Sequence, residues 1–165
     1  MEDLYTSFDS PLGTLLAVGD GRALTRLSMQ DAPRPLRVSP QWRREDGAFD
    51  ELRRQLDEYF AGVRREFDLQ LAPSGGEFEL AVWRALLEIP YGVTASYGEI
   101  ARRVGAPDAA RAVGVANARN PLAVIVPCHR VIGADGTLTG YGGGLEMKSW
   151  LLDHERRTPE APTRR

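Results

Sequence analysis

The chain has 165 residues, enough for one large domain or two small ones, and its 42% hydrophobic and 27% charged residues are typical of a globular protein. A single cysteine, Cys128, excludes an intramolecular disulfide and a zinc site of several thiolates, and no apolar run approaches the roughly 18 residues that cross a bilayer. The acidic N-terminus lacks the features of a signal peptide, so we expect a cytoplasmic protein, and the net charge of −2 gives no overall sign of nucleic-acid binding.

The first part of the chain predicts a small α/β domain. Short apolar or alternating segments, separated by turn residues, predict three strands over residues 4–8, 12–18 and 22–29. Apolar side chains at steps of three and four residues predict a helix over residues 48–63. A further alternation predicts another strand over residues 67–71.

A short segment of Ala, Pro, Ser and Gly, residues 72–76, is the best candidate for a domain linker. We therefore expect an N-terminal domain of residues 1–75 and a C-terminal domain of residues 76–165. Ser74 and Glu77 have the spacing of a capping box, which predicts that a helix begins there.

Beyond residue 90 the sequence predicts two short helices on either side of a turn that contains Gly105. Ser96 and Glu99 form a second capping-box pair at the start of a helix over residues 97–104, and the next helix covers residues 108–119. Two short helices joined by a tight turn are typical of a helix-turn-helix. The second helix is built largely from small residues, which let its backbone come close to whatever it packs on.

The charge of this stretch differs from that of the whole chain. Residues 100–130 hold five arginines and one acidic residue, Asp108, a net charge of +4 in a chain whose total is −2. A basic stretch on a helix-turn-helix pattern indicates contact with nucleic-acid phosphates. A solvated helix face that carries its arginines by chance is the alternative.

Cys128 and His129, which have the most reactive side chains in the sequence, follow the predicted helix-turn-helix along the chain. A continuous apolar run, residues 122–126, predicts a buried strand that ends just before Cys128 and His129. The imidazole could take the thiol proton, directly or through a water, to give a nucleophilic thiolate. A last helix over residues 145–157 could bring Glu155 back to orient the imidazole. The alternative is that the cysteine is an inert, buried hydrophobe.

The block from Ile125 to Ile132, which contains Pro-Cys-His-Arg, resembles the active-site signature of the O6-alkylguanine-DNA alkyltransferases, also called methylated-DNA–protein-cysteine methyltransferases. The resemblance continues in register through Pro90-Tyr91-Gly92, Ser96–Ala101, Ala110–Gly114, Asn120-Pro121, Gly140–Gly144 and His154-Glu155. These motifs span about residues 78–157, whereas the N-terminal half matches only in length and coarse pattern.

This resemblance implies a mixed α/β (α+β) fold, with a small ribonuclease H-like N-terminal domain and a mostly helical, winged helix-turn-helix-like C-terminal domain. It implies a monomer that acts on double-stranded DNA containing O6-alkylguanine, without a cofactor. Family members that carry a structural zinc use Cys and His in the N-terminal domain. Residues 1–75 contain neither, so we predict no metal site.

The resemblance also implies roles for individual residues. Cys128 takes the alkyl group in a single irreversible transfer, His129 acts as the base through a water, and Glu155 holds His129. Asn120 lies in the turn that shapes the site, where a simple helix C-cap role is compatible. Tyr97 donates its hydroxyl to the guanine and crowds the 3′ phosphate of the flipped nucleotide; otherwise it is an aromatic residue at a helix start.

A second group of residues is implied to contact DNA or the guanine base. Arg111 fills the gap left by the extruded base, unless it is only a surface charge. The further DNA-contacting residues are Tyr97, Ala112, Gly114 and Arg119. The residues implied to line the guanine pocket are Val131, Tyr141, Gly142 and Gly143.

Two other functions remain open from the sequence. A DNA-binding relative that recognises the lesion without transfer would lack the cysteine, so Cys128 argues against it. A Cys-His hydrolase on a small α/β fold would need an oxyanion hole and many turnovers, and it would leave the helix-turn-helix and Arg111 unexplained.

Overall fold

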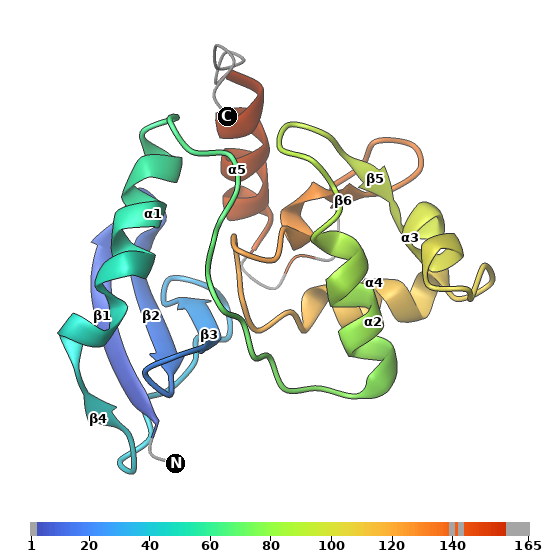
Figure 1. The fold of residues 1–165 in the computed structure, drawn as a ribbon. Coiled ribbons are helices and arrows are strands. Elements are labelled where there is room, and N and C mark those ends of the chain that lie inside the picture. Colours follow the sequence, from blue (N-terminus) through green and yellow to red (C-terminus); the bar gives the residue numbers. More distant parts are fainter. Residues whose placement is uncertain (1–2, 139–140, 142–143, 158–165) are drawn as a thin grey trace.

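The computed structural model describes residues 3–138, 141 and 144–157. The chain forms a mixed α+β structure, with a sheet in its N-terminal part and mainly helices in its C-terminal part (Figure 1). The predicted fold class is therefore confirmed. In the described part of the chain no helix is long and apolar enough to cross a membrane.

The N-terminal sheet has four strands among the described residues, in the order β3-β2-β1-β4. Its strands are β1 (Leu4–Ser10), β2 (Gly13–Gly19), β3 (Leu24–Met29) and β4 (Arg43–Arg44). The first three are antiparallel and match the predicted strands within a few residues, while β4 pairs parallel to β1. The β1–β2 turn needs glycine, because Gly13 has a φ of +87° and a Cβ there would lie 2.1 Å from the Asp31 carboxylate.

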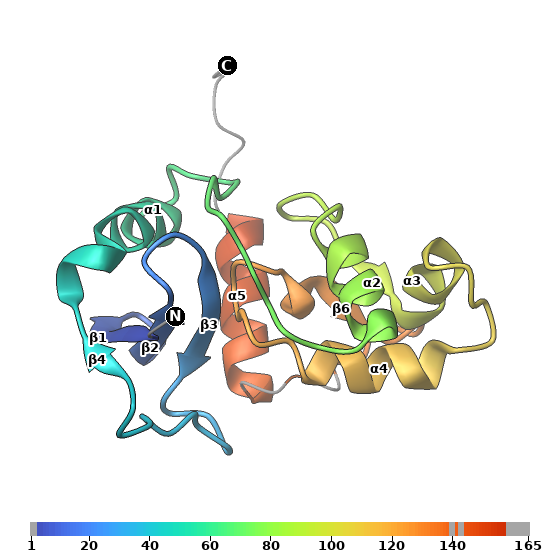
Figure 2. The same cartoon turned by 60° about the horizontal axis from the view of Figure 1, so that its bottom comes forward.

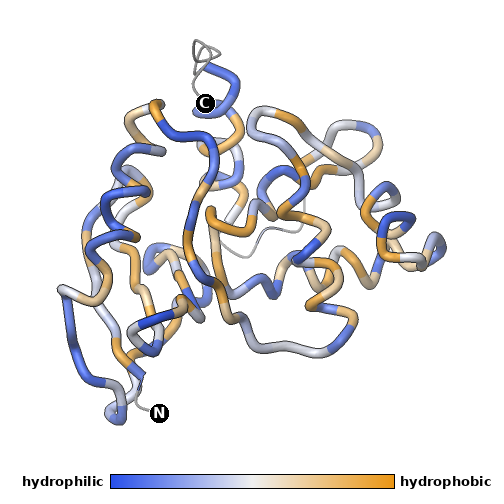
Figure 3. The backbone as a smooth tube through the Cα atoms, in the orientation of Figure 1, coloured by the Kyte–Doolittle hydropathy of each residue, from blue (hydrophilic) through white to orange (hydrophobic). Residues whose placement is uncertain are grey.

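Helix α1 (Asp50–Phe60) lies over one face of this sheet (Figures 1 and 2). It follows a 3-10 turn at Asp46–Phe49, and its buried residues include Leu52, Leu56 and Tyr59. The predicted helix is thus confirmed over a shorter range, since the chain reverses at Gly62, which has a φ of +81°. The strands carry hydrophobic stretches, whereas much of α1 is hydrophilic (Figure 3).

The C-terminal part packs helices around a short parallel pair of strands. The helices are α2 (Glu77–Leu86), α3 (Tyr97–Arg103), α4 (Ala110–Ala118) and α5 (Leu145–Arg157), and the strands are β5 (Ala95–Ser96) and β6 (Val131–Ile132). The capping box at α3 is confirmed: the Ser96 hydroxyl accepts from the Glu99 N–H and the Glu99 carboxylate accepts from the Ser96 N–H, both at 3.1 Å.

The capping box predicted from Ser74 and Glu77 is wrong. Helix α2 begins after Gly76, whose backbone N–H donates to the Glu79 carboxylate at 3.0 Å. The acidic residue three positions after the cap is therefore Glu79. The same spacing rule applies, but it applies two residues later along the chain.

Two predicted strands are absent. Of residues 67–71, only Leu71 makes a bridge, to Leu24 of β3. Residues 122–126 form buried turns, in which Val124 has a φ of +71° and the Val126 N–H donates to the Leu122 carbonyl at 3.0 Å. Burial of this apolar run was predicted correctly, but its backbone forms turns, in which the Ile125 N–H also donates to the Ala123 carbonyl at 2.8 Å.

The two parts of the molecule meet along β3 and along α5. The Leu27 N–H donates to the Pro121 carbonyl at 2.8 Å, and the Ala123 N–H donates to the Leu27 carbonyl at 3.1 Å. Helix α5 lies between α1 and the other C-terminal helices (Figure 2). Buried side chains form a hydrophobic cluster that extends over both parts, so the division at residues 75 and 76 stays a proposal about domain organisation.

Candidate active site

Cys128 begins a 3-10 turn, η2 (Cys128–Arg130), and its side chain is buried. The Asn120 Nδ2 donates to the Cys128 Sγ at 3.1 Å and to the Val126 carbonyl at 2.8 Å. The Asn117 Nδ2 donates to the Cys128 carbonyl at 3.2 Å. Asn117, in the last turn of α4, and Asn120, just after the helix, therefore fix the thiol and the turn that carries it.

The environment of the Cys128 thiol disfavours its ionisation in the free protein. Burial raises the pKa of Cys128 to about 11, although the Asn120 hydrogen bond and the charge of Lys148 act in the opposite direction. Lys148 is itself buried, and burial lowers its pKa to about 8. A thiol in this state needs a base that removes its proton as it reacts.

His129 is fully buried next to Cys128 in the chain, and its Nε2 lies 2.7 Å from the Glu155 Oε2. The carboxylate fixes the neutral tautomer with a proton on Nε2, because a carboxylate can only accept. The other ring nitrogen, Nδ1, has no hydrogen-bond partner among the described residues. Burial also lowers the pKa of His129, so Nδ1 is an unprotonated base at neutral pH.

Glu155 is held by donors from several parts of the chain. The Arg130 guanidinium donates from Nε to Oε1 and from Nη2 to Oε2, both at 2.9 Å, and the Gly92 N–H donates to Oε1 at 3.1 Å. The Tyr59 hydroxyl donates to Oε2 at 2.7 Å. Burial alone would raise the pKa of Glu155, but His129 and Arg130 hold it well below its usual range. Glu155 is therefore a carboxylate at working pH.

A cavity of about 610 Å³ leads to this cluster. Its lining includes Cys128, Asn120 and Tyr141 from the C-terminal part, and β3 with the loop that follows it from the N-terminal part. The Tyr141 hydroxyl is buried and has no hydrogen-bond partner among the described residues, so it could accept or donate to a molecule in the cavity.

Three other residues were predicted to line a guanine pocket: Val131, Gly142 and Gly143. Val131 is fully buried in β6, which pairs with β5, and its side chain belongs to the hydrophobic core. It is not among the described residues that line the cavity, and its role in a guanine pocket stays a prediction. Gly142 and Gly143 lie outside the described residues.

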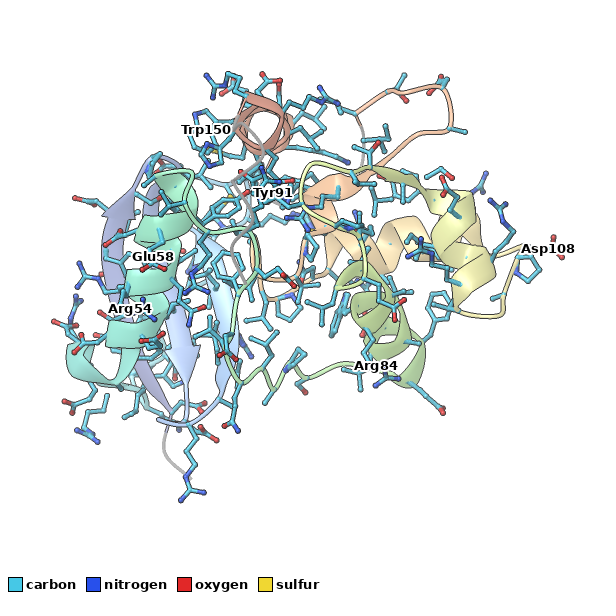
Figure 4. All side chains as sticks on the ribbon, turned by 45° about the horizontal axis from the view of Figure 1, so that its top comes forward. Arg54, Glu58, Arg84, Tyr91, Asp108 and Trp150 are labelled. Atoms are coloured by element: carbon cyan, nitrogen blue, oxygen red, sulfur yellow. The ribbon has the colours of Figure 1, made fainter. Side chains whose placement is uncertain are left out.

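The predicted DNA-contacting residues lie at the start of α3, along α4 and at the C-cap of α4. Arg111, Ala112 and Arg119 are exposed, and Arg119 lies 3.7 Å from Glu79 across an exposed ion pair. Tyr97 packs against Gly114, where a Cβ would lie 3.8 Å from its ring. Figure 4 shows Asp108, in the turn between these helices, at the outer edge of the molecule. This surface is exposed along α4, and its roles in DNA binding stay predictions.

Sequence reasoning missed several residues that shape the site. Tyr59 belongs to the apolar stripe of α1 and carries no local sign that its hydroxyl reaches Glu155. Asn117 and Lys148 are buried polar residues that the sequence patterns did not single out, and Asn117 lies in a helix built largely from small residues. Arg130 follows His129 directly in the chain, and its guanidinium holds the Glu155 carboxylate.

Comparisons with known proteins identify similar chains over nearly the whole length. A family model described as "6-O-methylguanine DNA methyltransferase, ribonuclease-like domain" matches residues 4–73, and one described as "6-O-methylguanine DNA methyltransferase, DNA binding domain" matches residues 77–157. The methylated-DNA–protein-cysteine methyltransferase of Mycobacterium leprae is 59% identical over 91% of this chain and 90% of its own length. That of Methanosarcina acetivorans is 51% identical over 92% of this chain and 97% of its own.

Solved structures of similar proteins have the same fold as this chain. The Mycobacterium tuberculosis O6-methylguanine methyltransferase superposes with a TM-score of 0.88 at 50% identity, covering 97% of this chain and 96% of that one. A structure titled as Mycobacterium tuberculosis OGT in complex with DNA superposes with a TM-score of 0.87 at 52% identity, covering 93% of this chain and 92% of that one.

Proposed function

Since the chain belongs to the 6-O-methylguanine DNA methyltransferase family of DNA repair enzymes, we propose that it transfers an alkyl group from the O6 position of guanine in double-stranded DNA to its own Cys128. The observation that carries this proposal is the arrangement of Asn120, Cys128, His129 and Glu155, of which Asn120 and Cys128 line a cavity. It unites a thiol, a neutral base and a carboxylate that orients the base.

The proposed reaction begins with removal of the thiol proton. His129 Nδ1 takes this proton through a water, and the Glu155 carboxylate stabilises the imidazolium that forms. The Asn120 amide donates to Sγ and so favours the thiolate. Sγ then forms a bond to the alkyl carbon while the bond between that carbon and O6 breaks, which leaves the electron pair on the guanine.

The guanine must gain one proton as the bond to its O6 breaks. The Tyr97 hydroxyl donates it, and the proton held by His129 returns to Tyr97 through solvent, so the products are a thioether on Cys128 and an unmodified guanine. A thioether has no easy route back to a thiol. Each protein molecule therefore acts once.

Access to a base in a duplex requires that the nucleotide leave the stack, which costs a few kcal/mol. Helix α4 supports this step, because its exposed small residues suit a close approach to the minor groove. Arg111 is exposed on α4 and would fill the gap in the stack. Arg119 would add a phosphate contact.

We also propose that the protein acts as a monomer in the cytoplasm, without a cofactor.

A mass measurement tests the proposal. The full-length protein is incubated with an excess of duplex that contains O6-methylguanine, and the peptide that contains Cys128 is weighed. We expect one methyl group on this peptide, none with Cys128→Ala, and none with a duplex of unmodified guanine. An unmodified Cys128 after exposure to excess substrate would overturn the proposal, and many products per protein would favour a hydrolase.

A further inference from the structure

The Tyr59 hydroxyl comes from the N-terminal part of the molecule and reaches the carboxylate that orients His129. It donates to the Glu155 Oε2 at 2.7 Å, and the His129 Nε2 lies 2.7 Å from the same oxygen. Tyr59 and Glu155 are 96 positions apart in the sequence. A side chain of α1 is therefore linked to the proposed base, His129, through one shared residue, Glu155.

Tyr59 is fixed on all sides. Its side chain is fully buried, and its backbone carbonyl accepts from the His154 Nε2 at 2.8 Å. Its ring centroid lies 5.2 to 5.9 Å from four other rings, those of Phe60, Phe67, Tyr91 and His154. Figure 4 shows Tyr91 in the middle of the molecule, between α1 and the C-terminal helices. The Tyr59 hydroxyl is thus held in one place rather than placed there by chance on a mobile side chain.

Toward the Glu155 carboxylate, the Tyr59 hydroxyl can act only as a donor, because a carboxylate only accepts. Burial and the charge of Glu155 both raise its pKa, so the phenol stays protonated at every pH at which the protein works. Among the described residues, Glu155 Oε2 accepts from Tyr59, His129 and the Arg130 Nη2. Each of these donors limits the rotation of the carboxylate and takes part of its charge.

We propose that Tyr59 is a positioning residue for alkyl transfer, which holds Glu155 in the orientation that His129 needs. The inference rests on the proposed function of Cys128 and His129. It makes the N-terminal domain a part of the reaction apparatus, because α1 completes a hydrogen-bond network whose other side chains all come from the C-terminal part. This assigns α1 a role beyond packing on the sheet.

The proposal predicts the direction of a pH effect. Without the Tyr59 hydroxyl, the Glu155 carboxylate directs more of its negative charge at His129 and stabilises the protonated imidazole. The acidic limb of the rate profile then moves to higher pH. The other charged or titratable groups around His129 and Glu155 are Arg130 of η2, Lys148 of α5, the Cys128 thiol and the Tyr141 phenol, and the substitution leaves all four in place.

The test compares Tyr59→Phe with Tyr91→Phe in the full-length protein. Both substitutions keep the ring and remove one hydroxyl, but the Tyr91 hydroxyl is buried and has no hydrogen-bond partner among the described residues. The measurement is the single-turnover rate of methyl transfer from a duplex that contains O6-methylguanine, as a function of pH. We expect Tyr59→Phe to slow transfer about tenfold, as losses of outer-shell orienting groups do, and to move the acidic limb to higher pH. Tyr91→Phe should match the wild type.

The outcomes separate this inference from the proposed function. If the wild type transfers no methyl group, the proposed function fails. If the wild type transfers and Tyr59→Phe does so at the same rate with the same pH profile, the proposed role of Tyr59 fails. Should Tyr59→Phe be poorly folded, a ring-fluorinated tyrosine at position 59 provides a stronger donor of nearly the same shape. The acidic limb should then move to lower pH, and an unchanged limb would overturn the inference.

Discussion

Asn120 and Cys128 are joined by a hydrogen bond in which the Asn120 Nδ2 donates to the thiol sulfur at 3.1 Å. The same side chain holds the turn before the thiol, because its Oδ1 accepts from the Leu122 N–H at 3.0 Å and its Nδ2 donates to the Val126 carbonyl at 2.8 Å. One amide therefore shapes the backbone and stabilises negative charge on Sγ. The structural and chemical roles considered for Asn120 are compatible.

The substitution Asn120→Asp keeps the bond that this side chain accepts and removes the bonds that it donates. An aspartate can still accept from the Leu122 N–H, but it has no donor for Sγ or for the Val126 carbonyl, and it places a carboxylate beside the thiol. We expect the pKa of Cys128 to rise above its value of about 11, and each unit of that rise costs about 1.4 kcal/mol of thiolate stability. Methyl transfer should slow at least about tenfold, measured by single-turnover kinetics across pH. Gln41→Glu, in an exposed loop, is the matched control, and equal rates for the two variants would contradict the assignment.

Glu155 is expected to be the most sensitive residue for stability. In Glu155→Gln the buried Arg130 guanidinium loses its counter-charge, and leaving a buried charge unpaired costs about 3–5 kcal/mol. Urea unfolding measures the difference. Asp153→Asn on the same helix is the control, because its ion pair with Arg156 is exposed and 3.9 Å long, and it should change the free energy of unfolding by less than about 0.5 kcal/mol. A similar effect of both substitutions would show that the Glu155 network contributes little.

The parts of the fold that the sequence predicted depend on local patterns. The stripe of α1, the helix at residues 145–157 and the capping box of Ser96 and Glu99 are each set by residues within a few positions of one another. The apolar run of residues 122–126 was misassigned because hydrophobicity reports burial and not backbone direction. Its turns depend on the Asn120 side chain and on the left-handed Val124.

In the candidate site, too, the sequence indicates contacts between residues that are close in the chain more readily than contacts between distant residues. Cys128 and His129 are adjacent in the chain, and their chemistry is visible in the sequence. Glu155 was expected on the last helix, and the structure brings it to His129. Tyr59 was not predicted, because nothing in the pattern of α1 indicates a carboxylate that lies 96 positions away. Val131 was predicted to line the pocket; its side chain is buried in β6, which pairs with β5, and its role stays a prediction.

Stability should fall on the acidic side of neutrality. His129 has a pKa below its ordinary value of 6.5, so the unfolded chain binds a proton more readily than the folded one and stability declines as pH falls below about 6.5. Glu155 has a pKa below its ordinary value of 4.5, so its contribution is complete above that pH and is lost as pH falls toward the folded value. Urea midpoints at successive pH values should therefore decrease from neutral pH downward. A constant midpoint between neutral pH and pH 4.5 would contradict the His129 assignment, and a constant midpoint below pH 4.5 would contradict the Glu155 assignment.

Arg111 should matter for duplex DNA and little for single strands. Its side chain is exposed on α4, so Arg111→Ala should leave the thermal unfolding midpoint unchanged. In a duplex the flipped base leaves a gap whose opening costs a few kcal/mol, and without Arg111 we expect methyl transfer to slow at least about tenfold. A single-stranded oligonucleotide has no stack to repair, so its rate should change far less. The control is Arg54→Ala, which removes the same charge from α1, where Arg54 makes ion pairs with Glu51 and Glu58. An equal loss of rate on both kinds of DNA would mean that Arg111 binds phosphate and does not fill the gap.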